Sequence, residues 1–137
     1  MTEPRYFVDE ADVPSFGFDW GRTTFTASSE VTGAKAISVA VVAMNPGQGH
    51  ARHNHPAAEE VIYILSGTGE QMIEDERGRP VTRPVGPGTT VYVPQARFHA
   101  TLNTGKDPLR LLVAFSPSGS EDELRQLPDF RLIPPGQ

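Results

Sequence analysis

Residues 47–67, GQGHARHNHPAAEEVIYILSG, hold three of the four histidines of the chain and two glutamates between flanking glycines. His53 and His55 are two residues apart, so both side chains point to one face if this segment is extended. Glu60 follows a Pro-Ala turn at the start of a predicted strand whose isoleucines share its face. A buried carboxylate above apolar side chains needs a positive partner. The segment therefore predicts a divalent metal, and a solvated polar loop is the alternative that the clustering disfavours.

The remaining histidine lies in a second segment, residues 88–103, which reads GTTVYVPQARFHATLN. It places His99 on a separate predicted strand. Closure of a barrel could bring this strand back over His53 and His55, so all three imidazoles could meet at one point.

Short runs of β-branched and aromatic residues dominate the rest of the chain. Glycine and proline, 13 of each, separate these runs. Strands are predicted at 23–28, 36–44, 60–66, 70–74, 89–94, 99–103 and 109–115. Many short strands with turn residues between them predict an all-β sandwich or small barrel.

One short helix is predicted near the C-terminus. Ser120 and Glu123 form an S-x-x-E capping box, and Pro128 ends the helix. The tail that follows, residues 129–137, is expected to lie extended against the barrel. The helix is interpreted as structural.

A single domain is expected for the 137 residues. Its parts are an N-terminal arm at about 1–35, a barrel core at about 36–116, and a C-terminal helix and tail at about 117–137. Aromatic side chains of the arm are expected in the core or at a dimer interface: Phe16, Phe18, Trp20 and Phe25.

Charge and cysteine content exclude several classes. The formal net charge is −5 without a block of basic residues, which disfavours nucleic acid or an anionic membrane as a partner. Because the chain has no cysteine, any metal must be held by His, Asp or Glu. The N-terminus is acidic and polar, no apolar run reaches membrane-spanning length, and a cytoplasmic location is expected.

Two motifs give the sequence a resemblance to the cupins. The first, G-x5-H-x-H-x4-E-x6-G, is matched with every spacing kept by Gly47, His53, His55, Glu60 and Gly67. The second, G-x5-P-x-G-x2-H-x3-N, is matched by Gly88, Pro94, His99 and Asn103. Ala96 stands where the second motif prefers glycine, a departure expected to leave the fold intact.

The resemblance implies a cupin jelly-roll barrel of six to eight strands, also called a double-stranded β-helix, which is usually a homodimer. It implies one divalent metal per chain, held by three histidines and one glutamate. Carried onto this sequence, the metal ligands are His53, His55, Glu60 and His99.

This ligand set suits Mn, Fe, Ni, Co, Cu or Zn, and on a six-coordinate ion it leaves two positions for other ligands. A 2-oxoglutarate oxygenase is a competing interpretation. It is disfavoured because His55 stands where that family needs a carboxylate.

Three further residues are candidates for a role in the site. Arg97 shares strand parity with His99 and could grip an anionic substrate, the alternative being a surface ion pair. His50 has the opposite parity to His53, which favours a solvent loop over a supporting or gating role. Gln71 could face the cavity. Glu59 is expected on the surface, and Tyr63 beneath the second sheet.

Function has two candidate classes. The first is a metal-dependent enzyme acting on a small oxygenated substrate (carboxylate, enediol or diketone), such as a dioxygenase, decarboxylase, isomerase or cyclase. The second is a non-catalytic module that binds a metal chelate or a sugar. The expected partners are a small-molecule substrate and a second copy of the chain.

Overall fold

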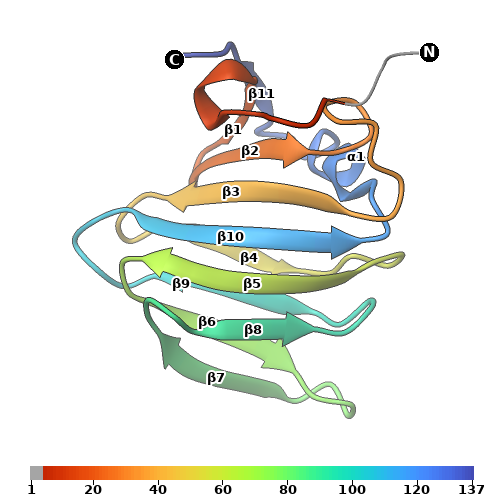
Figure 1. Ribbon diagram of the computed structural model, residues 1–137. Coiled ribbons are helices and arrows are strands. Elements are labelled where there is room, and N and C mark those ends of the chain that lie inside the picture. The colour runs from red at the N-terminus through yellow and green to blue at the C-terminus, as the bar shows by residue number, and fades with distance from the viewer. Residues whose placement is uncertain (1–4) are drawn as a thin grey trace.

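The predicted strands pair into two antiparallel sheets in the computed structural model, which describes residues 5–137 (Figure 1). The seven-stranded sheet has the order β11 (Arg131–Ile133), β1 (Ser15–Phe18), β2 (Gly21–Ala27), β3 (Ser38–Met44), β10 (Leu109–Ser116), β5 (Glu59–Ser66) and β8 (Thr90–Val93). The four-stranded sheet has the order β4 (Gly49–His53), β9 (His99–Asn103), β6 (Gly69–Glu74) and β7 (Pro80–Val85). A short 3-10 helix (Glu10–Asp12) and helix α1 (Ser120–Leu124) complete the described elements.

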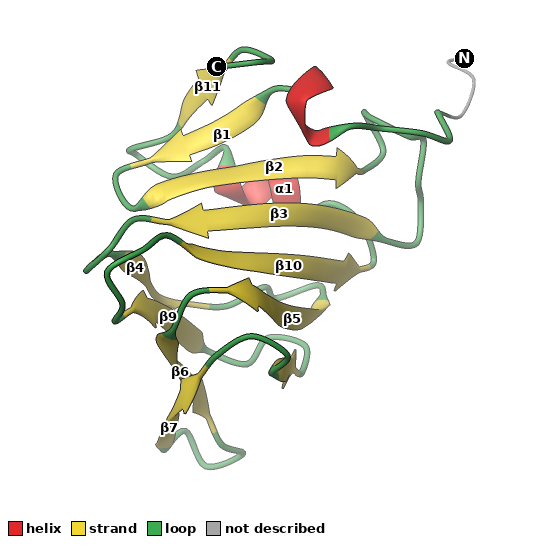
Figure 2. Cartoon of the chain, turned by 60° about the vertical axis from the view of Figure 1, so that its left-hand side comes forward, coloured by secondary structure: helices red, strands yellow, loops and turns green. Residues whose placement is uncertain are grey.

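The four-stranded sheet lies behind the seven-stranded sheet in Figure 1, and the turned view in Figure 2 shows the two as separate layers. The buried apolar side chains form one core cluster. This all-β jelly-roll architecture with one short helix confirms the predicted fold class. Residues 5–137 form eleven strands rather than the six to eight implied by the resemblance. The additional strands include β1 and β11 at one edge of the large sheet and β7 at one edge of the small sheet.

Strand β5 shows how alternation builds the interior. Glu60, Ile62 and Ile64 point inward and are 5%, 2% and 0% exposed, as their shared parity predicts. Full burial of an isoleucine side chain contributes about 1.5–3 kcal/mol. The two isoleucines are the apolar neighbours of Glu60 on the inward face of β5.

The aromatic arm belongs to the core. Phe16, Phe18 and Phe25 are buried on β1 and β2, and Trp20 is buried in the turn between these strands. Phe18 stacks on Trp20 with ring centroids 5.1 Å apart. The aromatic side chains of the arm therefore pack within their own chain.

The C-terminal segment differs from the prediction in detail. Helix α1 forms, but its N-cap is Gly119, and no side chain of the described residues caps it, so the predicted Ser120 capping box is wrong. Instead the Gly119 N–H donates to Glu121 Oε1. The tail is extended as predicted, because β11 pairs with β1, although Leu132 remains 59% exposed.

The outer face of the large sheet carries several apolar side chains. Tyr63 is 40% exposed there, so the prediction that it packs beneath the second sheet is wrong. The reason is strand parity: Tyr63 alternates with the inward Ile62 and Ile64, and no second layer covers this face among residues 5–137. We call this surface the outer apolar face; its exposed members are Val61, Tyr63, Leu65, Tyr92 and Leu112.

No helix of residues 5–137 is long and apolar enough to cross a membrane.

Candidate metal centre

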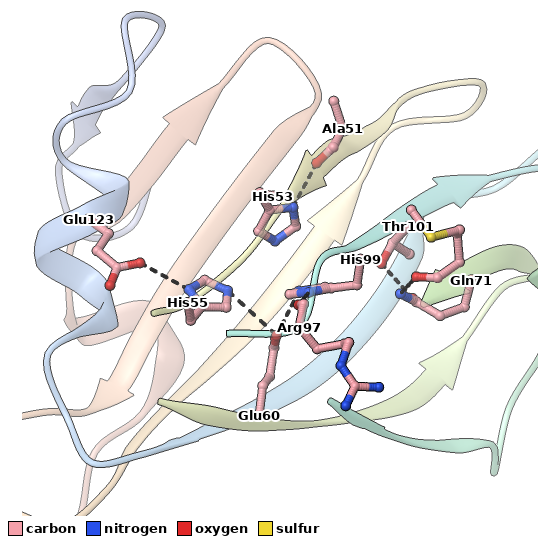
Figure 3. A network of polar contacts seen from close by, with 10 residues as sticks. Ala51, His53, His55, Glu60, Gln71, Arg97, His99, Thr101 and Glu123 are labelled. Carbon is pink, nitrogen blue, oxygen red and sulfur yellow. Dashed lines mark hydrogen bonds and ion pairs between the residues drawn. The ribbon is translucent and has the colours of Figure 1, made fainter. Parts of the chain in front are cut away.

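Three histidines from two distant segments meet inside the barrel (Figure 3). His53 ends β4 and pairs in register with His99, the first residue of β9. His55 lies two residues beyond the end of β4. Each of the three offers a ring nitrogen, and these nitrogens all lie within 4.8 Å of one another. The predicted convergence of the imidazoles is therefore present.

The Nδ1 atom of each imidazole faces an acceptor. His53 Nδ1 lies 2.7 Å from the Ala51 carbonyl oxygen, and His99 Nδ1 lies 2.9 Å from the Arg97 carbonyl oxygen. His55 Nδ1 lies 3.2 Å from Glu123 Oε2 on α1. Because a carbonyl or carboxylate oxygen only accepts, each Nδ1 carries the proton. The lone pair of each ring is left on Nε2, which is the form that binds a metal.

Glu60 brings a carboxylate to the same point. Its Oε1 atom lies 3.0 Å from His99 Nε2 and 3.5 Å from His55 Nε2. Glu60 Oε1 and His99 Nε2 are both fully buried, and neither makes a hydrogen bond with a partner among residues 5–137. Two lone-pair atoms this close in a buried site repel unless they share a cation, either a proton or a metal ion. The donor set and these two atoms fit a divalent metal.

The protonation of His53 agrees with a ligand role. Burial, followed by the positive charge of neighbouring His50 and His99, lowers the pKa of His53 to about 2. His53 is therefore neutral near pH 7, and its ring is available as a nitrogen donor.

His50 lies beside this cluster, contrary to the expectation of a solvent loop. Its ring stacks on His53 with centroids 3.6 Å apart and on Trp20 at 5.3 Å. The strand pairing of β4 with β9 shifts register between His50 and His53, so simple alternation does not hold across this interval. Burial, then the charge of His55 and His99, lowers the pKa of His50 to about 4.

Arg97 does not face the site. Its guanidinium donates to the carbonyl oxygen of Glu74, and the side chain extends away from the imidazoles in Figure 3. The turn from Pro94 to Arg97 explains this, because Ala96 at its third position has φ +64 and redirects the chain. Such a positive φ favours glycine, which is the residue of the motif. The Arg97 guanidinium therefore lies outside the cavity lining, and only the Arg97 carbonyl oxygen contacts the site, through His99.

Gln71 is buried but lies behind the cavity wall. It is 3% exposed, and its Oε1 atom accepts a hydrogen bond of 2.6 Å from Thr101 Oγ1. Thr101 lines the cavity at the metal centre and Gln71 does not. Asn103 of the second motif is structural, because its Nδ2 atom donates to the carbonyl oxygens of Met44 and Asp107.

Glu123 was missed as a site residue. The sequence suggested only a cap for the helix, and the contact with His55 joins residues 68 positions apart. Glu59 lies on the surface as predicted, where its carboxylate accepts a 2.7 Å hydrogen bond from Tyr92.

A cavity of about 40 Å³ adjoins the centre inside the barrel. Its polar lining consists of the imidazoles, Glu60 and two threonines, from both sheets. The remaining lining is apolar: Trp20, Val42, Met44, Ile62, Leu111, Val113, Phe115 and Leu124. A small molecule bound beside the centre would therefore contact mostly apolar side chains.

The barrel and its cluster of three histidines and one glutamate define the class of cupins. A family model described as Cupin domain matches residues 40–115, and the chain belongs to this family. The match includes both motifs and every residue of the cluster.

Among curated proteins, the glucose-6-phosphate isomerase of Thermococcus kodakarensis is 35% identical over 70 residues, covering 51% of this chain and 37% of that protein. Germin-like protein 1 of Brassica napus is 30% identical over 109 residues, covering 80% of this chain and 51% of that protein. This chain spans about two fifths to one half of the length of these relatives. Protein SchB of Streptomyces halstedii is 27% identical over 125 residues, covering 90% and 87%.

Among solved structures, the oxalate decarboxylase of Lactobacillus farciminis in its formate complex superposes with a TM-score of 0.73 at 27% identity. The superposition covers 79% of this chain and 32% of that one. An oxalate decarboxylase of Bacillus subtilis, described with Mn(II) centers, gives a TM-score of 0.68 at 27% identity over 86% of this chain and 28% of that one.

Proposed function

We propose that this cupin is a metal-dependent enzyme that acts on a small oxygenated substrate. One divalent transition metal would be held by His53, His55, Glu60 and His99. The observation that carries this proposal is the pair of buried, unpartnered atoms Glu60 Oε1 and His99 Nε2, which point at each other across the imidazole cluster. One divalent cation bound by both atoms would satisfy them together.

Each residue of the centre has a defined task. The Nδ1 hydrogen bonds of the three imidazoles fix their tautomers and aim Nε2 inward. Glu123 orients His55 from α1, and Glu60 supplies the negative charge. Bound metal would contribute Lewis acidity toward an oxygen of the substrate. His50 is the remaining ionisable side chain on the cavity, so it is our candidate for moving a proton there.

The relatives support an enzymatic role by analogy. Several carry the names of enzymes, namely glucose-6-phosphate isomerase and oxalate decarboxylase, and one of these structures is described with Mn(II). Another relative is named auxin-binding protein 1, which keeps a non-catalytic binding module as the second candidate. Fold likeness alone does not decide between them.

The test begins with elemental analysis of the purified protein, which should show close to one transition metal per chain. Dioxygen uptake and turnover of carboxylate, enediol and diketone compounds are then measured with the loaded protein. Replacement Glu60→Gln keeps the size and an oxygen donor but removes the charge. With metal in excess, an enzyme should lose far more activity than occupancy, whereas a binding module should lose ligand affinity only in step with occupancy. Full turnover by loaded Glu60→Gln would contradict the enzymatic proposal.

The homodimer and the cytoplasmic location also remain proposals. The outer apolar face offers a flat surface on β5, β8 and β10 that a second copy could cover. The aromatic arm no longer supports dimerisation, because its side chains are buried within the chain.

A further inference from the structure

The cavity at the metal centre contains only one formal charge from its own side chains. Among residues 5–137, its lining includes Glu60 and four histidines but no lysine or arginine. Arg97 is engaged with the carbonyl oxygen of Glu74, and Arg52 pairs with the Glu74 carboxylate. A second anionic group on a ligand would therefore meet no cationic side chain inside.

Charge balance then limits the ligand. A divalent metal with neutral imidazoles and the Glu60 carboxylate has a net charge of one positive unit; the Glu123 carboxylate that contacts His55 lies outside the cavity lining, is 42% exposed and is screened by solvent. A ligand with one negative charge makes the filled site neutral. A dianion leaves one uncompensated negative charge against apolar side chains such as Leu111, Val113 and Phe115. Burying an unpaired charge in such surroundings is strongly unfavourable.

The volume limits the ligand as well. The cavity measures about 40 Å³. An apolar cavity of about 150 Å³ accommodates benzene, and a single water needs about 10–15 Å³. The space near the metal centre therefore accepts a group of only a few non-hydrogen atoms.

We propose that the centre selects a small monoanionic oxygen donor with an apolar body, such as a short monocarboxylate, and discriminates against dianions. The inference rests on the metal centre of the proposed function. It separates this chain from relatives whose names refer to oxalate or to glucose 6-phosphate, since both are dianions near pH 7.

A matched pair of probes tests the charge rule. Propionate and malonate both have three carbons, and malonate carries a second carboxylate in place of the propionate methyl group. Calorimetric titration of each into fully Zn²⁺-loaded protein should show propionate binding at least about tenfold more tightly, because only malonate leaves a buried net charge. Zinc content is measured before and after each titration, so that metal removal by the ligand is not counted as binding.

A cation placed in the cavity should change the preference. Leu124 lines the cavity from α1, so Leu124→Lys supplies a partner for a second carboxylate. The ratio of propionate to malonate affinity should fall at least about threefold in this variant. Gln126→Lys adds the same charge at an exposed position of the same segment and should leave the ratio unchanged. If Leu124→Lys does not fold, the wild-type ratio decides alone.

The outcomes separate the two proposals. Loaded protein that binds malonate as tightly as propionate, or binds neither, overturns the inference and leaves the metal centre standing. Protein that cannot hold zinc at all overturns the proposed function, and the inference with it.

Discussion

Glu123 provides the sharpest test of how the centre is assembled. Replacement Glu123→Gln keeps the shape and an oxygen that can accept from His55 Nδ1, but it removes the charge. His55 is 5% exposed, whereas the Glu123 side chain is 42% exposed, so solvent screens part of the interaction. Loss of a group that orients a metal-bound histidine typically weakens metal affinity about 10–100-fold. Because Glu123 is partly exposed, we expect Glu123→Gln to weaken zinc affinity by the lower value, about tenfold or about 1.4 kcal/mol.

The assay is competition for Zn²⁺ against a chromophoric chelator. Asp122→Asn is the matched control, because it removes the same charge from the same helix at a side chain that pairs with Arg125 rather than His55. Glu123→Ala, which removes the acceptor as well, should lose more affinity than Glu123→Gln. Equal zinc affinities for Glu123→Gln, Asp122→Asn and the parent protein would refute the role given to Glu123.

Four other predictions follow from the same geometry. His99→Ala should purify with little transition metal, because it removes one member of a set of four proposed ligands; full loading by elemental analysis would show that the ligands lie elsewhere. Tyr63→Glu should shift sedimentation toward monomer by placing a charge on the outer apolar face, and a parent protein that is monomeric at micromolar concentration would remove the dimer proposal. Ala96→Gly should raise the free energy of unfolding by about 0.5–1 kcal/mol, since φ +64 costs an alanine more than a glycine; an unchanged urea midpoint would count against this. The metal-free protein should lose stability as pH falls from about 6.5 toward about 4, because the lowered pKa of His50 lets the unfolded chain take up the proton first; the loss should shrink in His50→Asn, and equal pH dependence would contradict the cause.

The parts that the sequence predicted depend on local spacing. His53 and His55 converge, and Glu60 lies above its isoleucines, because two-residue alternation on neighbouring strands decides both. The position of His50 could not be obtained this way, because the register shift depends on pairing with β9. Arg97 follows a positive-φ residue in a tight turn, so strand parity did not apply to it.

Other features depend on contacts between distant segments. Glu123 reaches His55 across 68 positions, and no local pattern signals that contact. Strand β7 was missed because its sequence, PVTRPV, is mostly exposed and contains two prolines. The prolines are tolerated because β7 lies at the edge of its sheet. The backbone N–H groups that proline lacks are not needed on the unpaired side of an edge strand.

The attachment of α1 to the centre links the end of the chain to metal occupancy. Glu123 contacts a proposed ligand, Leu124 lines the cavity, and β11 then continues the large sheet. If metal binding stabilises the docked position of α1, docking of α1 must increase metal affinity by the same free energy, because the coupling is reciprocal. Amide hydrogens of α1 should therefore exchange more slowly with solvent in the loaded protein, and a protease that needs this segment undocked would cleave the metal-free form first.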